Sequence, residues 1–234
     1  MNPPQAAEPQ GGRVHRLGRP SVPRLTVDKI GHEALALLEE EGALSLPRLA
    51  ERLGVRQSAF YKHVTSRADI VELARGALAE RTVFGKLSRQ LDVLVVEVFE
   101  ALLKTYQGVP ALLPLILVQP VTNAEALAVY EQIASALLDA GVPDRLVLPT
   151  IEAIDSAAIG AALDTQAMEN AWQVPEDSHG DFRNLVRAQE AVAKDRSDRF
   201  DFLARTLAAG LSVTAAPEAA VLRAVDDADD DAGF

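Results

Sequence analysis

The sequence predicts an all-α fold, on three observations. Alanine and leucine, both strong helix formers, dominate the composition, whereas aromatic residues make up only 5% of the 234 residues. Apolar residues recur at helical spacing from residue 26 onwards, and no segment of useful length alternates with the period of a strand. The hydrophobic content of 48% suffices for a buried core and excludes a disordered chain.

The two ends differ from the rest of the chain. Residues 1–24 contain five prolines and three glycines, which predict a flexible arm, and four arginines make this arm basic. Such an arm either tracks DNA phosphates or is a solvated tail, and the sequence leaves both open. Residues 215–234 include five aspartates and predict a solvated acidic tail.

The first four helices are recognised by residues that cap or end helices. They are expected from Thr26 to a stop at Gly42, from the N-cap Ser45 past Pro47 to Gly54, over Gln57–Val64, and from Arg67 towards Phe84.

The later helices are marked by long apolar stripes between Pro, Gly and polar breaks. We expect them over 88–106, 110–118, 123–140, 143–170, 181–195 and 198–212. The chain therefore divides into residues 25–84, which end with the start of the fourth helix, and a larger helical domain over 85–214.

Charge is distributed unevenly along the chain. The net charge of −11 argues against a nucleic-acid partner, yet residues 1–89 hold 14 Lys and Arg against 10 Asp and Glu, and the remainder is strongly acidic. Such asymmetry hints at a basic binding module joined to an acidic one. The absence of cysteine excludes disulfides and thiolate metal sites, and no apolar run has the length of a membrane span. We expect a soluble, cytoplasmic protein.

Residues 46–64 (LPRLAERLGVRQSAFYKHV) carry the functional motif. Ala50 is small where two helices would cross, Gly54 suits the turn, and Phe60 would lock the second helix onto the first. This pattern predicts a helix-turn-helix, whose second helix enters the major groove of DNA. The outward face of that helix would present Gln57, Ser58, Tyr61 and Lys62, which are polar or amphipathic side chains without a single acid.

The segment from Thr26 to Arg81, with its AFYKHVTSRADIVELA portion, resembles the DNA-binding domain of the TetR family of bacterial transcriptional repressors. The phrase DRFDFLARTLAAGL resembles the family's last long helix. The resemblance implies an N-terminal three-helix helix-turn-helix domain, joined through a long fourth helix to a ligand-binding and dimerisation domain. It also implies a homodimer that binds a double-stranded DNA operator and is released by a small-molecule inducer. We expect no catalytic activity, because no common catalytic string is present, and no cofactor or metal, because no cluster of His, Asp and Glu stands on one helix face.

The resemblance assigns DNA contacts by position. It implies base contacts by Arg56, Gln57 and Ser58. It implies contacts to the DNA backbone by Tyr61, Lys62 and His63, and phosphate contacts by Ser45 and Arg67. Pro47 stands where some members place a basic residue, so Arg48 either replaces that contact or the contact is absent. The alternatives are that Tyr61 packs against the first helix and that His63 is structural or merely exposed.

The larger domain would hold the dimer seam and the ligand pocket. The seam is expected between the 143–170 and 198–212 helices, with small residues such as Ala158 in it; packing of these residues inside one subunit is the alternative. A pocket combines apolar walls with a few polar groups, and the ligand is expected to be lipophilic, with aromatic and cationic compounds as candidates. The residues predicted to line the pocket are Phe84, Leu87, Leu91, Leu103, Leu117, Gln119, Asn123, Tyr130, Thr150, Ile151 and Asp155. The alternative for each of them is a place in the plain core or on the surface.

Two other function classes would leave their own marks in the sequence. A helical ligand-binding or scaffolding protein without DNA binding would be marked by acids on the second helix of the motif, and none are there. A helical enzyme would need clustered histidines and acids, yet the four histidines are scattered along the sequence.

Overall fold

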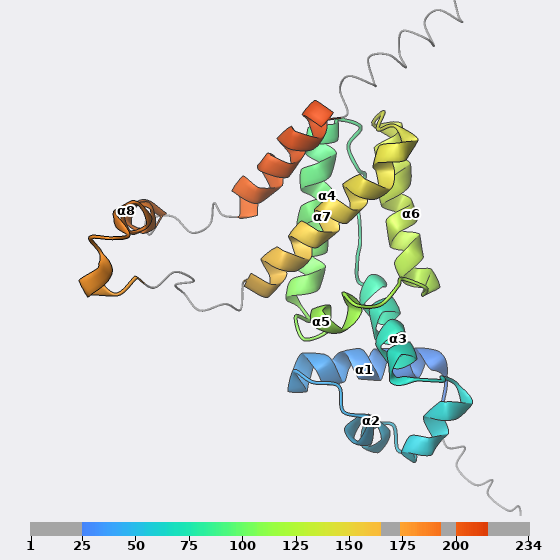
Figure 1. The fold of residues 1–234 in the computed structure, drawn as a ribbon. Coiled ribbons are helices and arrows are strands. Elements are labelled where there is room, and N and C mark those ends of the chain that lie inside the picture. The colour runs from blue at the N-terminus through green and yellow to red at the C-terminus, as the bar shows by residue number, and fades with distance from the viewer. Residues whose placement is uncertain (1–24, 165–173, 193–199, 215–234) are drawn as a thin grey trace, which may run out of the picture.

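The computed structural model describes residues 25–164, 174–192 and 200–214 (Figure 1). These residues form helices and the connections between them, and no β-strand, as the sequence predicts. The predicted basic arm and acidic tail lie outside the described residues. So do the predicted helix ends over 165–170, 193–195 and 198–199.

The N-terminal part folds at the predicted positions, because its caps and turns are encoded locally. Thr26 accepts a hydrogen bond from the Lys29 amide at the start of the first helix, and Gly42 and Gly54 adopt the left-handed conformation with φ of 68° and 65°. Its elements are α1 (Val27–Glu41), α2 (Leu46–Arg52), the 3₁₀-helix η1 (Gln57–Lys62) and α3 (Arg67–Ala79).

Two of these elements differ from the prediction. The segment expected as a helix over 57–64 is a 3₁₀-helix that ends at Lys62, and Val64 is buried just beyond it. Helix α3 ends at Ala79, so Phe84 lies in the connection that follows and not on the helix. The last turn tightens through a bond from Thr82 N to Ala79 O, and the β-branched Thr82 and Val83 and then Gly85 disfavour continuation.

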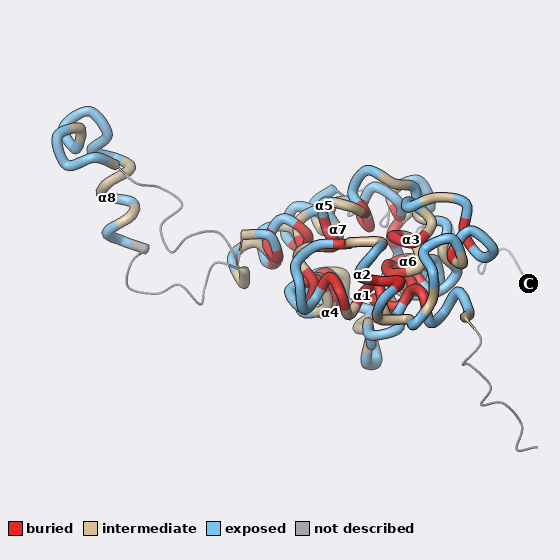
Figure 2. Tube along the Cα trace, turned by 90° about the horizontal axis from the view of Figure 1, so that it is seen from below, coloured by how far each residue is buried: buried red, intermediate tan, exposed pale blue. Residues whose placement is uncertain are grey.

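The larger part is a group of helices above the N-terminal part (Figure 1). Helix α7 crosses α4, and α6 stands on the other side of α7. Helix α8 stands away from the body in Figures 1 and 2. The elements are α4 (Leu91–Gln107), α5 (Leu113–Ile116), α6 (Ala124–Asp139), α7 (Asp144–Asp164), the short 3₁₀-helix η2 (Glu176–Ser178), α8 (Arg183–Val192) and a last helix over 200–214.

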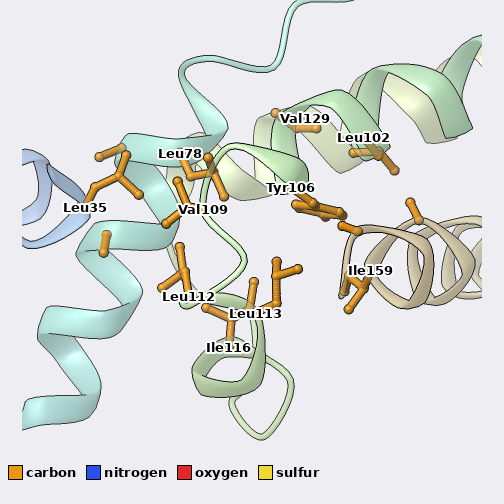
Figure 3. Close-up of a cluster of buried hydrophobic side chains, with 14 of the residues drawn as sticks. Leu35, Leu78, Leu102, Tyr106, Val109, Leu112, Leu113, Ile116, Val129 and Ile159 are labelled. Carbon is orange, nitrogen blue, oxygen red and sulfur yellow. The ribbon is translucent and has the colours of Figure 1, made fainter. Parts of the chain in front are cut away.

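One continuous apolar cluster joins the two parts (Figure 3). It runs from Leu35 on α1 and Leu78 on α3, through Ile116 on α5, to Tyr106 on α4 and Ile159 on α7. Because α3 contributes to the packing of both parts, a displacement of α3 would shift the packing of both.

Helix α7 is, among the described residues, the one helix that is long and apolar enough to cross a membrane. It packs against α4 and α6 in the body of the protein. Its residue Ala158 is fully buried within the subunit, so the prediction that Ala158 lines a seam between subunits is wrong. The exposed side of α7 instead carries Leu148, Gly160 and Leu163.

Candidate nucleic-acid interface and ligand cavity

Helix η1 buries one side and exposes the other. Phe60 of η1 is buried in the core of the N-terminal part, as is Val64 just beyond the helix. Gln57, Ser58 and Lys62 are exposed. Tyr61 is 57% exposed, so more than half of its surface is open to a partner. The outward face thus combines hydrogen-bonding groups and a cation without a carboxylate.

The two arginines of α2 are engaged within the protein. Arg48 forms ion pairs with Glu41 (2.9 Å) and Glu51 (2.6 Å), while Arg52 pairs with Glu33 and Glu40. A contact from Arg48 to a phosphate would therefore compete with two carboxylates.

The other predicted DNA contacts are differently placed. Arg56, Lys62 and His63 are exposed and form no ion pair with any of the described residues. Ser45 is the N-cap of α2 without a side-chain capping bond, and Arg67 donates a hydrogen bond to the Leu44 carbonyl (3.1 Å). Arg56 and Lys62 thus offer their positive charges outwards.

The predicted ligand residues do not form one group. Phe84 and Leu87 line a surface groove of about 1100 Å³ between the 84–89 connection, α4 and α6. Leu117 is 56% exposed, and the Asn123 side chain caps α6. Three others are core or partly buried core (Leu91, Leu103 and Ile151), Thr150 is buried, and the Gln119 carbonyl accepts a bond from Arg75.

Tyr130 and Asp155 do meet, in a polar cluster inside the helical part. The Tyr106 hydroxyl donates to Oδ1 of Asp155 (2.5 Å) and the Tyr130 hydroxyl donates to Oδ2 (3.3 Å). Burial raises the pKa of Asp155, while the two hydroxyls and the nearby Arg75 charge partly oppose the rise. Burial beside this carboxylate also raises the pKa of Tyr130 to about 12 and that of Tyr106 well above its usual range.

A small cavity adjoins this cluster. Its volume is about 30 Å³, which is room for one water molecule, and Tyr106, Tyr130, Arg75 and Thr82 line it together with apolar side chains. Sequence reasoning missed Tyr106 and Arg75, because Tyr106 continues the apolar stripe of α4 and Arg75 reads as an exposed charge. The described residues contain no group of three or more His, Asp and Glu suited to a metal ion.

Comparison with known proteins agrees with this architecture. No family model matches the chain. The chain is 27% identical over 217 residues to an HTH-type transcriptional regulator of Saccharopolyspora erythraea, and the match covers 84% of this chain and 88% of that protein.

Solved structures share its fold. Apo ActR from Streptomyces coelicolor superposes with a TM-score of 0.71 at 21% identity, over 83% of this chain and 98% of ActR. ActR is described as a TetR-family protein and has been solved in complex with actinorhodin. A single-residue variant of TetR from Acinetobacter baumannii, in complex with minocycline, superposes with a TM-score of 0.61 at 21% identity, over 82% of this chain and 95% of that one. With its helix-turn-helix, its order of helices and these similarities, the chain has the fold of the TetR-family transcriptional regulators.

Proposed function

We propose that this chain is a ligand-responsive transcriptional regulator that binds a palindromic DNA operator as a homodimer. The observation that carries the proposal is the acid-free outward face of η1, with Tyr61 and Lys62 exposed while Phe60 anchors the helix. Repression is the action favoured by the family resemblance, although the sign of regulation depends on where the operator lies.

The exposed side chains suit two kinds of DNA contact. Gln57 pairs bidentately with adenine, and Arg56 with guanine, which supports base reading by the start of η1. Lys62 and Tyr61 are placed one turn further along, where a cation and a hydroxyl suit phosphate oxygens. Ser58, His63, Arg67 and Ser45 extend the proposed interface.

A dimer is required for a palindrome, because each helix-turn-helix reads one half-site. Two helices offer surfaces for it. The last helix exposes Phe202 (72%) and Val213, and α7 exposes Leu148 and Leu163 on the face away from its core contacts. Burial of these apolar side chains between two copies would supply the driving force for association.

The ligand is proposed to be a lipophilic small molecule with a hydrogen-bonding group. Most of the side chains that line the cavity beside the Tyr106–Asp155–Tyr130 cluster are apolar, and the Asp155 carboxylate of the cluster accepts from hydroxyl groups. A drug-sized molecule exceeds the 30 Å³ cavity several times over, so its binding must move the surrounding helices. Such movement is what a ligand-operated switch requires.

Selection from a random pool of duplex DNA tests the proposal. The full chain should enrich a palindrome whose half-site centres lie about one helical turn apart, or a multiple of it. Compounds with a lipophilic ring system and a hydroxyl or amine are then screened for release of that duplex. Failure to enrich any sequence would contradict the DNA-binding proposal, and enrichment of a single isolated half-site would contradict the dimer.

A further inference from the structure

Helix α3 carries an oppositely charged pair that is almost removed from solvent. Glu72 and Arg75 lie one turn apart, with side chains 12% and 8% exposed, and Oε2 of Glu72 is 3.0 Å from Nε of Arg75. These two atoms face each other without the alignment of a hydrogen bond and have no other partner among the described residues. A buried pair of this kind is rarely a gain in stability, so its other contacts matter more.

Arg75 holds the end of α5. Its Nη2 donates to the carbonyl of Ile116 (2.8 Å), the last residue of α5, and to the carbonyl of Gln119 (3.1 Å) in the following connection. A cation is the complement of the carbonyl groups that a helix leaves unpaired at its C-terminus.

Glu72 holds the start of α6. Its Oε1 accepts from the amides of Thr122 (2.6 Å) and Asn123 (2.8 Å), and Asn123 is the N-cap of α6. A carboxylate is the complement of the unpaired amides at a helix N-terminus. The pair on α3 therefore fixes both ends of the 117–123 connection.

Close approaches at two glycines pack α3 tightly against both of its neighbours. A Cβ on Gly31 of α1 would lie 2.6 Å from the Leu73 carbonyl oxygen, and a Cβ on Gly76 would lie 2.3 Å from the Asn123 side chain. Leu73 and Gly76 flank Arg75 on the same helix. A movement at the start of α6 would therefore move α3, and α3 would move the N-terminal part with it.

Arg75 also lines the small cavity, beside Tyr106 and Tyr130. Any enlargement of that cavity moves the guanidinium or the residues packed on it. The same guanidinium holds the 117–123 connection, so a change in the cavity cannot leave the connection undisturbed.

We propose that the Glu72–Arg75 pair is the positioning device that couples the cavity and the 117–123 connection to the DNA-binding helices. This inference rests on the proposed DNA-binding function. Glu72 and Arg75 are positioning residues, since their side chains are almost removed from solvent and act through α3. The coupling is reciprocal, so DNA bound to η1 must restrain the 117–123 connection in return.

Hydrogen exchange of the full chain, with and without a duplex recovered by selection, tests the inference. Binding of the duplex should slow exchange of the amides over 121–128 about fivefold or more in the wild type. The double variant Glu72→Gln/Arg75→Met leaves no unpaired buried charge, and it should bind the duplex while this distant slowing disappears.

Two further variants serve as a matched control and as a conservative substitution. Arg81→Met removes an arginine just beyond α3 that pairs with Glu39 on α1, and it should keep the slowing because it does not touch the 117–123 connection. Arg75→Lys keeps the charge but loses the forked donor, so it should retain less than half of the slowing. This variant provides the test in case the double variant does not fold.

The outcomes separate the two proposals. Slowing over 121–128 that persists in the double variant or is undiminished in Arg75→Lys would overturn the inference. So would a wild type in which η1 is protected by the duplex while 121–128 is unaffected. A wild type that binds no selected duplex would overturn the DNA-binding function itself, and the inference with it.

Discussion

Gly31 of α1 and Leu73 of α3 meet backbone to backbone, with the Leu73 carbonyl oxygen 2.6 Å from where a Cβ of residue 31 would lie. Real Cβ atoms do not approach an oxygen so closely, so only glycine fits at this point. This contact sets the distance between α1 and the helix that leads into the larger part of the chain.

Substituting Gly31→Ala should lower the free energy of unfolding by about 1–3 kcal/mol, because the added methyl forces the two helices apart. Alanine in a helix otherwise gains up to about 1 kcal/mol over glycine, so the sign of the effect is diagnostic. Gly108→Ala is the matched control, since a Cβ there meets nothing closer than 3.4 Å. Urea unfolding of both variants measures the difference, and equal stability of the two would refute the close contact.

The two tyrosines of the buried cluster should contribute unequally. Tyr106→Phe removes a 2.5 Å donor from Asp155 and should cost about 1–3 kcal/mol, because a buried carboxylate then loses its main partner. Tyr130→Phe removes a 3.3 Å donor and should cost less. Denaturant unfolding of the two variants decides the order, and a larger loss in Tyr130→Phe would contradict the geometry.

His32 should make the N-terminal part more stable below neutral pH. Its Nδ1 lies 2.8 Å from the Asp28 carbonyl and its Nε2 2.9 Å from Glu80, and the hydrogen bond to Asp28 is the main cause that raises the His32 pKa above its usual value of 6.5. A raised pKa in the folded state gives stability that is fully present below pH 6.5 and lost as the pH rises through the folded-state pKa.

Unfolding of the wild type and of His32→Gln at about pH 5.5 and about pH 8 checks this sign. The wild type should exceed the variant by more at the lower pH than at the higher, and by less than about 1 kcal/mol because the pair is exposed. Glu80→Gln should flatten the same difference. A wild-type advantage that grows towards the higher pH would show the assigned sign to be wrong.

A charge on the last helix should prevent dimer formation. Phe202→Glu places a carboxylate on the exposed apolar face proposed for the seam and should give monomers at micromolar concentration. Val83→Glu changes an equally exposed apolar residue elsewhere and should leave the dimer intact. Sedimentation velocity distinguishes the species. An intact dimer in Phe202→Glu would place the seam elsewhere.

Local signals in the sequence predicted the N-terminal part well. Thr26, Gly42 and Gly54 fix helix ends through their own backbone and side-chain preferences, and the buried Phe60 fixes the orientation of η1. The end of α3 was predicted less well, because apolar residues continue past Ala79 into a connection that is not helical.

Long-range contacts explain what the sequence could not predict. Arg75 looks like a surface charge until α5 and α6 are placed against α3, and the Tyr106–Asp155 bond joins residues 49 positions apart. Ala158 is small, which suits a subunit seam and a crossing of helices inside one subunit equally. Only the packing of α7 against α4 and α6 decides between the two.

The most direct test of the account is the salt dependence of duplex binding by fluorescence anisotropy, using the selected palindrome. Lys62→Ala should weaken binding to all sequences and reduce the slope of log K against log salt by about one unit per binding site, because one phosphate contact is lost. Tyr61→Ala should also weaken binding, while Lys104→Ala, on the exposed surface of α4, should change neither the affinity nor the slope. Undiminished affinity in both Lys62→Ala and Tyr61→Ala would contradict the assignment of η1 as the DNA-reading element.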